Sequence, residues 1–315
     1  MTEIKDIGEF GLIDRLKERI GEDEGVVKGI GDDCAVLEDR ENYQLLTTDM
    51  LVSGDHFNRE WQSPWQIGWK SIVVNVSDIA SMGGVPKWAL VSMALPDDVS
   101  VEYIDQIFGG MIDASDEYDL SIIGGDTTHG DLLVMNVALI GEVKKEDLCM
   151  RSDAEVGDMI CVSGDVGKSW AGLELLRAGE DGYTDFYLEP YCRLDISGKL
   201  APIVNAMIDV SDGVASEVGH ICEESGVGAE VYKDKIPISD KTKEAGKILG
   251  KDPMFWALSG GEDFELLFTI DEEKIDSIDG IDYTKIGKIT KSGMFLADED
   301  GEKSELKGGY DHFSG

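Results

Sequence analysis

The segment SPWQIGWKSIVVNVSDIASM, residues 63–82, predicts a long and mostly apolar helix. Ser63 followed by Pro64 is typical of an N-cap and a first helical position. Asp78 lies among apolar neighbours in this segment, and Asn75 lies almost one turn earlier on the same face. Because a buried carboxylate is costly unless it is paired or bound to metal, Asp78 is a candidate metal ligand. The alternative is an aspartate near the helix C-terminus that reaches solvent.

Strands and helices alternate on both sides of this helix, so the predicted fold class is α/β or α+β. Hydrophobic periodicity and strand-forming runs locate the individual elements. The predicted strands are residues 26–30, 43–48, 86–95, 120–123, 132–143, 159–162, 206–210, 264–270 and 283–289, and the predicted helices are residues 4–20, 63–82, 101–118, 169–177, 191–205 and 214–225.

The chain of 315 residues is long enough for two domains. Residues 144–158 are polar, charged and nearly free of apolar periodicity, and the alternation of elements restarts after them. We therefore place the domain boundary there, with an N-terminal α/β domain at residues 1–147 and a C-terminal α+β domain at residues 148–315. Acidic, glycine-rich segments occur in both halves, which predicts a site between the domains.

The composition excludes several classes of partner. Sixty-five acidic residues outnumber 28 basic ones, and the formal net charge of −37 argues against nucleic acid or an anionic membrane surface. No apolar run approaches the length of a membrane span. The acidic N-terminus does not resemble a signal peptide, so the expected location is the cytoplasm. The five cysteines are scattered and never form a CxxC pair, which favours reduced thiols.

Most of the acidic residues are expected to coat the surface, for example in the runs at residues 22–24, 271–273 and 298–300. Such a coat is typical of proteins in a salty cytoplasm, where counterions screen the repulsion between like charges. We therefore expect the melting temperature to fall when the ionic strength is lowered. Thermal unfolding at a series of KCl concentrations measures this, and a melting temperature independent of salt would contradict it.

Short segments that combine acidic residues with glycine or threonine recur along the chain. Glycine lets the backbone approach a ligand closely, and aspartate offers the hard oxygen ligands that Mg²⁺ binds. We expect these segments to lie at the ends of strands or helices. Each one alone could be a helix cap or a turn. Together they predict one binding site for a magnesium nucleotide. They are Gly31-Asp32-Asp33, Thr47-Thr48-Asp49, Asp78 before Gly83-Gly84, Gly124-Gly125-Asp126, Asp209-Val210-Ser211-Asp212-Gly213 and Gly260-Gly261-Glu262-Asp263.

The segment Gly164-Asp165-Val166-Gly167-Lys168-Ser169 is similar to part of a P-loop, but a P-loop needs glycine at position 162, where this chain has Val162. We therefore interpret the segment as a strand-to-helix turn, with Lys168 as a phosphate contact the less favoured alternative. No Gly-x-Gly-x-x-Gly follows a strand, so nothing supports a Rossmann site.

Catalysis by a side-chain nucleophile is not indicated, because no Ser-His-Asp set or Cys-His pair stands out. His56 lies shortly after Asp49 and is one of four histidines. A lone histidine is commonly structural or solvated, but its closeness to Asp49 makes contact with a substrate an equal alternative.

Nine segments spread nearly end to end carry a family resemblance. They are Gly8-Glu9-Phe10-Gly11-Leu12-Ile13, Gly31-Asp32-Asp33, Thr47-Thr48-Asp49, Gly54-Asp55-His56-Phe57, Val74-Asn75-Val76-Ser77-Asp78, Gly83-Gly84-Val85-Pro86-Lys87-Trp88-Ala89-Leu90, Gly124-Gly125-Asp126-Thr127, Asp209-Val210-Ser211-Asp212-Gly213 and Gly260-Gly261-Glu262-Asp263-Phe264. In this order they resemble the thiamine-monophosphate kinase family, within the superfamily related to aminoimidazole ribonucleotide synthetase. The resemblance implies a two-domain fold whose N-terminal domain forms a homodimer through its β-strands.

The resemblance also implies phosphoryl transfer from ATP to thiamine monophosphate, which yields ADP and thiamine diphosphate. Residues of this chain match three groups of functional positions in the family. The positions that match ligands of several Mg²⁺ ions are Asp33, Thr47, Thr48, Asp49, Asp78, Asp126, Asp209 and Asp212. The positions that match ATP contacts are Phe108, Gly125, Asp126, Arg151 and Ser211. The positions that match substrate contacts are His56, Glu262 and Tyr310.

This reaction is physically consistent with an acidic, metal-binding site. Joining two phosphates brings negative charges together, and two unit charges about 4 Å apart repel by about 4 kcal/mol at an effective dielectric of about 20. Metal ions held by carboxylates would reduce this repulsion and align the reacting groups. A phosphate monoester is already nucleophilic near neutral pH, so we expect direct in-line transfer without a general base or a phosphoenzyme.

Two positions depart from the family pattern, and three rival functions stay open. Residues 189–194 lack the family's first arginine and second proline, which leaves Arg193 without an assigned role, and Tyr310 stands where tryptophan is frequent. Selenophosphate synthetase would need a reactive cysteine or selenocysteine before Gly31, and the hydrogenase maturation enzyme would need a C-terminal cysteine, whereas this sequence ends in Gly315. The third rival is a non-catalytic protein that binds divalent metal.

Overall fold

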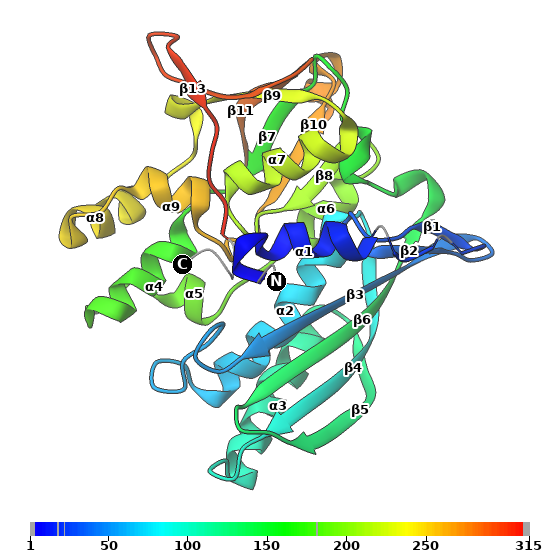
Figure 1. The fold of residues 1–315 in the computed structure, drawn as a ribbon, viewed down its shortest axis with the longest axis vertical. Helices are drawn as coiled ribbons and strands as arrows, with labels where there is room; N and C mark the ends of the chain where they lie inside the picture. Colours follow the sequence, from blue (N-terminus) through cyan, green and yellow to red (C-terminus); the bar gives the residue numbers. More distant parts are fainter. Residues whose placement is uncertain (1–3, 18, 22, 181, 311–315) are drawn as a thin grey trace.

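The computed structural model describes residues 4–17, 19–21, 23–180 and 182–310. Two mixed sheets, one above the other in Figure 1, organise the molecule. The first sheet is built from the N-terminal half of the chain and the second from the C-terminal half. Helix α2 (Pro64–Ser81) contacts strands of both sheets, so it joins the two halves.

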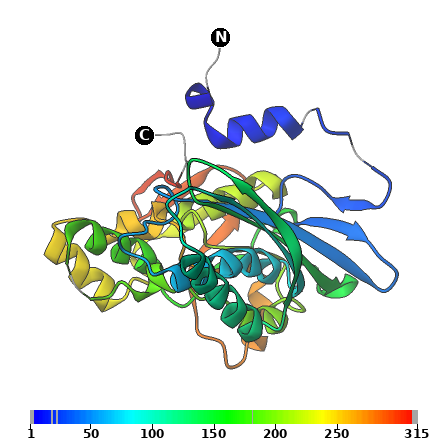
Figure 2. The ribbon, with the colours of Figure 1, turned by 90° about the horizontal axis from the view of Figure 1, so that it is seen from below.

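The first sheet has the strand order β1-β2-β3-β6-β4-β5, in which only β4 and β5 pair in parallel. Side chains of β6 alternate between buried and partly buried, as expected when one face lies on a core. Helices α2 and α3 (Val101–Glu117) cover that face (Figures 1 and 2). The strands are β1 (Val26–Lys28), β2 (Ala35–Glu38), β3 (Asn42–Val52), β4 (Val85–Leu95), β5 (Ser121–His129) and β6 (Val134–Lys144).

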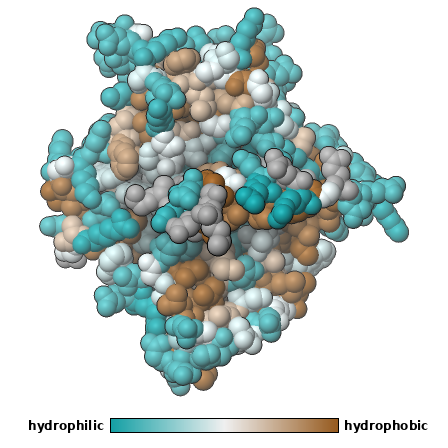
Figure 3. All heavy atoms as spheres, viewed as in Figure 1, coloured by the Kyte–Doolittle hydropathy of each residue, from teal (hydrophilic) through white to brown (hydrophobic). Residues whose placement is uncertain are grey.

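The other face of this sheet is apolar and open. Met50, Trp88, Leu90 and Ile123 are between 41% and 58% exposed. Figure 3 shows brown, apolar groups over the lower part of the molecule, where Figure 1 places this sheet. Strand β5 lies at the edge of the sheet, and most of its residues are exposed. An exposed edge strand beside an open apolar face is typical of a surface that another chain covers.

Helix α2 confirms the prediction for residues 63–82. Ser63 Oγ accepts a hydrogen bond from the Gln66 N–H at 3.2 Å, and the Gln66 side chain accepts one from the Ser63 N–H at 2.9 Å. The helix crosses α3 closely, because a Cβ at Gly68 would lie only 1.9 Å from the carbonyl oxygen of Ile107. The close crossing buries most of the helix and sets its position firmly in the first core.

The second sheet has the strand order β13-β12-β9-β11-β7-β10-β8, in which only β12 and β9 pair in parallel. Its strands are β7 (Met159–Ser163), β8 (Ala206–Asp209), β9 (Gly228–Tyr232), β10 (Leu266–Ile270), β11 (Tyr283–Thr290), β12 (Met294–Ala297) and β13 (Lys303–Glu305). The helices of this half are α4 (Lys168–Ala178), α5 (Asp185–Leu188), α6 (Leu194–Leu200), α7 (Val214–Ser225), α8 (Asp240–Leu249) and α9 (Pro253–Ser259). Across the described residues, every helix is too short or too polar to cross a bilayer.

Two strands of the first sheet run further than predicted. Strand β3 continues to Val52 because it pairs with β6 over its whole length, so the segment 47–49 lies inside the strand and not at its end. Strand β5 continues to His129 because it pairs with β4, so the segment 124–126 also lies inside a strand. A Cβ at Gly125 would lie 1.7 Å from the carbonyl oxygen of Val91, and this pairing therefore requires glycine.

Two predicted helices are shorter in the structure. The predicted helix 4–20 divides into a 3₁₀ turn, Ile4–Asp6, and α1 (Gly8–Lys17), whose first residue, Gly8, adopts a φ of 68°. Residue 18 lies outside the described residues. The predicted helix 191–205 is reduced to α6, because Pro202 has no backbone N–H to continue it. Figure 2 shows α1 on the outside of the molecule.

Candidate active site

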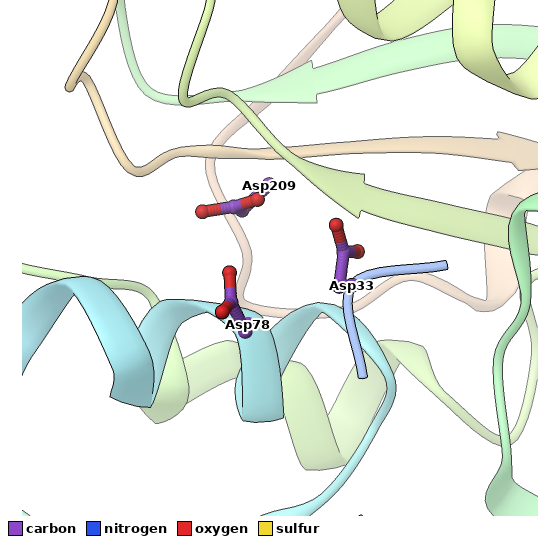
Figure 4. Close-up of side chains that lie close together, drawn as sticks. All are labelled: Asp33, Asp78 and Asp209. Atoms are coloured by element: carbon purple, nitrogen blue, oxygen red, sulfur yellow. The ribbon is translucent and has the colours of Figure 1, made fainter. Parts of the chain in front are cut away.

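Three carboxylates from distant parts of the chain meet beside α2 (Figure 4). Asp33 lies in the loop after β1, Asp78 lies in α2, and Asp209 is the last residue of β8. One oxygen of each lies within 4.8 Å of the others, and the side chains point toward a common centre. We call these three residues the aspartate cluster. A group of hard oxygen donors this close together suits a divalent cation such as Mg²⁺.

Serine hydroxyls of α2 orient two members of the cluster. Ser77 Oγ donates a hydrogen bond to Asp209 Oδ2 at 2.5 Å. Ser81 Oγ donates one to Asp33 Oδ2, also at 2.5 Å. Because Ser77 and Ser81 lie one turn apart, the helix that carries Asp78 also supplies the donors that hold its neighbours.

The cluster concentrates negative charge in a buried place. Burial, and next the charge of Asp33, raises the pKa of Asp209 to about 8. The same two causes raise the pKa of Asp49 to about 6 and the pKa of Asp32 to about 7. Burial, followed by the charges of Asp49 and Asp209, raises the pKa of Asp78 well above its usual value. A bound cation would relieve this repulsion, so these residues fit a divalent metal.

Strand β3 directs alternate side chains to opposite faces of the sheet. Thr47 Oγ1 donates a hydrogen bond to the carboxylate of Asp78. The Asp49 N–H donates to the side-chain oxygen of Asn75 in α2 at 3.0 Å, so residues 47 and 49 lie on the side of the cluster. Thr48 lies on the other face, where its hydroxyl donates to Asn136 at 3.3 Å.

Three residues predicted from the second half lie beside the cluster. The guanidinium of Arg151 forms an ion pair with Asp33, and the Arg151 N–H donates to Asp32 Oδ2 at 3.2 Å. Ser211 and Asp212 follow Asp209 directly and line the same cavity as the cluster. The structure therefore brings these parts of the predicted nucleotide and metal sites together.

Asp126 and Phe108 lie away from the aspartate cluster in the folded chain. Asp126 aligns through β4 and β6 with Met50 of β3, three strand spacings or about 14 Å away. Residues paired in this way share a face, which is the open face of the sheet and not the face toward α2. Phe108 lies on α3 against the first core. The structure does not bring either side chain to the aspartate cluster of the same chain.

One cavity of about 270 Å³ connects two members of the cluster, Asp78 and Asp209, with the predicted substrate contacts. Trp170 of α4 and Tyr187 of α5 add aromatic surface to it. Its wall includes the predicted metal ligands Asp49, Asp78, Asp209 and Asp212 and the predicted substrate contacts His56, Glu262 and Tyr310. Because the first half of the chain supplies Asp49, His56 and Asp78, the cavity lies between the two halves, as predicted.

His56 is held in one tautomer by the end of β3. The Val52 N–H donates a hydrogen bond to His56 Nδ1 at 3.2 Å, so Nδ1 is an acceptor and Nε2 carries the proton. Gly54 adopts a φ of 93° in the turn between these residues. The imidazole can therefore donate a hydrogen bond from Nε2 to an anionic group in the cavity.

Sequence reasoning missed Lys70, which is fully buried in α2. Its Nζ forms an ion pair with Glu262 Oε1 at 2.5 Å and donates to the carbonyl oxygen of His56 at 3.0 Å. The sequence could have indicated Lys70, because a charged lysine inside the apolar segment 63–82 is costly to bury unless it is paired, as is true of Asp78.

The turn before α4 confirms the interpretation against a P-loop. Gly167 has a φ of 80° and begins the helix without a side-chain cap. The carboxylate of Asp263 accepts hydrogen bonds from the N–H groups of Gly167 and Ser169, the latter at 3.0 Å. Two backbone donors that a phosphate could use are therefore already occupied.

Lys168 and Arg193 both bind the carboxylate of Glu265. Lys168 Nζ forms an ion pair with Glu265 Oε1, and Arg193 Nη1 lies 3.1 Å from Glu265 Oε2. Glu265 is 3% exposed, so the two cations neutralise a buried charge. This gives Arg193 a structural role and leaves Lys168 paired within the protein.

Two family models match the chain in the order of its two sheets. The model for AIR synthase related protein, N-terminal domain, matches residues 31–143, and the model for AIR synthase related protein, C-terminal domain, matches residues 155–296. A solved structure of E. coli HypE shares this fold, with a TM-score of 0.69 at 21% identity. The fold is thus that of an AIR synthase related protein.

Relatives with higher sequence identity to this chain define its family within the AIR synthase related proteins. Thiamine-monophosphate kinase of Aquifex aeolicus (strain VF5) is 38% identical and aligns over 98% of this chain and 99% of its own. The enzyme of the same name from Bacillus subtilis (strain 168) is 37% identical over 97% and 99%. The structure described as "AaThiL complexed with AMPPCP and TMP" has a TM-score of 0.90 and covers 99% of both chains at 37% identity. The chain belongs to the thiamine-monophosphate kinase family.

Proposed function

We propose that the protein transfers the γ-phosphoryl group of ATP to thiamine monophosphate, giving ADP and thiamine diphosphate, the final step in making that product. It is then a phosphotransferase with a phosphate group as acceptor, acting in the cytoplasm. The observation that carries the proposal is one cavity that joins Asp78 and Asp209 of the aspartate cluster to His56, Glu262 and Tyr310. Full-length similarity to thiamine-monophosphate kinases supports the choice of substrates.

The acidic residues would hold several Mg²⁺ ions between the two substrates. Bound Mg²⁺ neutralises phosphate charge, which lowers the repulsion between donor and acceptor. The close approach of Asp33, Asp78 and Asp209 and the hydrogen bonds from Ser77 and Ser81 support this role for the aspartate cluster. The further ligands we propose are Thr47, Thr48, Asp49, Asp126 and Asp212, of which Thr48 can take part from this chain only through its backbone.

The remaining residues of the site bind and orient the substrates. We assign Arg151, Ser211, Gly125, Asp126 and Phe108 to ATP, and His56, Glu262 and Tyr310 to thiamine monophosphate. His56 can donate from Nε2 to the acceptor phosphate. A carboxylate at Glu262 can accept hydrogen bonds from the amino-substituted pyrimidine of the substrate. No residue has to remove a proton, because the acceptor phosphate is already ionised near neutral pH.

A homodimer would explain the position of Asp126. Asp126 is part of the exposed edge strand β5, and its side chain lies on the open apolar face of the first sheet. We propose that two N-terminal domains, with the boundary at 147/148, pair through this sheet, and that the partner chain completes the nucleotide site. The apolar side chains of Met50, Trp88, Leu90 and Ile123 support this face as the interface.

Coupled assays of ADP release test the proposed reaction. We expect ADP release that depends on both Mg²⁺ and thiamine monophosphate, with equal amounts of thiamine diphosphate formed. A metal-binding protein without catalysis would release no ADP. ADP release that does not require thiamine monophosphate would favour another ATP-using activity of the same fold.

Direct in-line transfer makes a second prediction about intermediates. In single-turnover experiments with ATP labelled on the γ-phosphate, the label should pass to thiamine diphosphate without appearing on the protein. The reason is that the acceptor phosphate is itself nucleophilic near neutral pH, so no side chain has to form a covalent intermediate. Rapid quenching and gel analysis measure this, and a labelled protein band that forms and decays at the rate of turnover would contradict direct transfer.

A further inference from the structure

We propose that Lys70 is a positioning residue that fixes the Glu262 carboxylate and the His56 loop at the substrate-binding part of the cavity. The inference rests on the proposed function, because it assumes that His56 and Glu262 contact thiamine monophosphate. Lys70 would act through these two residues and not by touching the substrate.

The contacts of Lys70 use its whole ammonium group. Nζ lies 2.5 Å from Glu262 Oε1 and 3.0 Å from the carbonyl oxygen of His56. It also lies 4.4 Å from the centre of the Tyr187 ring, over its face. The side chain of Lys70 is 0% exposed, whereas that of Glu262 is 25% exposed. The lysine is therefore enclosed by protein groups, and Glu262 is the member of the pair that a ligand can reach.

The backbone at Glu262 is held in a conformation that requires support. Glu262 has a φ of 66°, and Phe264 has a φ of 50°, both in the left-handed region that side-chain-bearing residues rarely adopt. The Glu262 N–H donates to the carbonyl oxygen of Ser211 at 2.8 Å. A Cβ at Gly261 would lie 2.2 Å from that same oxygen, so the loop approaches Ser211 as closely as glycine allows. Strain of this kind persists where surrounding contacts enforce it, and the ion pair with Lys70 is one such contact.

The position of Lys70 in α2 relates the two parts of the site. Asp78 lies eight residues further along the same helix, which corresponds to about 12 Å along the axis. One rigid helix thus carries a member of the aspartate cluster and the residue that holds Glu262. The spacing between the metal-binding and substrate-binding parts of the cavity is set by this helix, across the junction of the two halves of the chain.

Steady-state kinetics of Lys70→Met test the inference. We expect the KM for thiamine monophosphate to rise by about tenfold or more, because an ion pair that positions a substrate contact is lost. The KM for ATP should stay within about twofold of wild type, since Lys70 does not contact the residues assigned to ATP. Lys70→Arg keeps the charge and should restore part of the loss. Lys243→Met, which removes an exposed lysine of α8, is the matched control and should behave as wild type.

A double-mutant cycle separates positioning from a general structural role. Glu262→Gln should itself raise the KM for thiamine monophosphate, and adding Lys70→Met should then raise it by less than about twofold more. Equal rises in both KM values, or fully additive effects, would overturn the inference. If Lys70→Met does not fold, Lys70→Arg tests the inference in its place. Its displaced charge should still raise the KM for thiamine monophosphate and leave the KM for ATP unchanged. A wild-type KM for thiamine monophosphate would overturn the inference. A wild-type protein without turnover of thiamine monophosphate would instead overturn the proposed function.

Discussion

Asp78→Asn is expected to lower kcat by about a thousandfold or more with the fold retained, because charge stabilisation at transferring phosphate groups is worth several kcal/mol. Asp78 lies at the centre of the arrangement: it is part of the aspartate cluster, and Thr47 donates to it. Asparagine has nearly the same shape and can still accept from Thr47, so the packing of α2 should survive. What it lacks is the negative charge that a divalent cation requires.

Two measurements check this prediction. ADP release coupled to thiamine diphosphate formation gives kcat, and the near-ultraviolet circular dichroism spectrum tests whether the fold is intact. Asp279→Asn, at an exposed position remote from the cavity, provides the control and should keep wild-type activity. An Asp78→Asn protein that retains more than about a tenth of wild-type kcat would remove Asp78 from the metal site.

The second large effect concerns stability in the absence of metal. With EDTA present, Asp209→Asn should be more stable than wild type, by an amount that grows as the pH rises. The Asp209 carboxyl loses its proton near pH 3.8 when unfolded, but only near pH 8 when folded, mainly because it is buried. Between these values the folded state binds more protons than the unfolded state, so wild-type stability falls with rising pH. Asparagine has no proton to lose, and it can still accept the hydrogen bond from Ser77.

Urea denaturation at several pH values and constant ionic strength measures the difference. Constant salt matters because the net charge of −37 makes stability sensitive to screening. Addition of Mg²⁺ should reverse the order, because a ligand at about 100 times its Kd stabilises the folded state by about 2.7 kcal/mol. The variant should gain much less from Mg²⁺. A stability difference that does not change with pH, or an equal gain from Mg²⁺, would contradict the assignment.

The parts of the fold that depend on local signals could be predicted from the sequence. Ser63, Pro64 and the apolar run that follows define α2, and the structure shows the predicted cap. The same logic singled out Asp78, since a carboxylate in an apolar helix needs a partner. The carboxylates of Asp33 and Asp209 lie close to that of Asp78, as expected of acidic residues that share a cation.

The parts that depend on pairing between distant residues could not be predicted in this way. The segment Thr47–Asp49 lies within β3 because β3 continues to pair with β6, which follows more than eighty residues later in the chain. Lys70 and Glu262 are separated by 192 residues, and no local pattern relates them. The place of Asp126 on the open face depends on the order of strands in the sheet, which the family resemblance implied only in outline.

The turn between β7 and α4 contains an anion supplied by the protein itself. The carboxylate of Asp263 is covalently tethered, so its effective concentration at the N–H groups of Gly167 and Ser169 is on the order of millimolar or higher. Free phosphate would have to compete with it and leave a buried carboxylate without partners. The sequence Gly167-Lys168-Ser169 therefore does not indicate phosphate binding here, since a carboxylate of the protein itself already occupies two N–H donors of the turn.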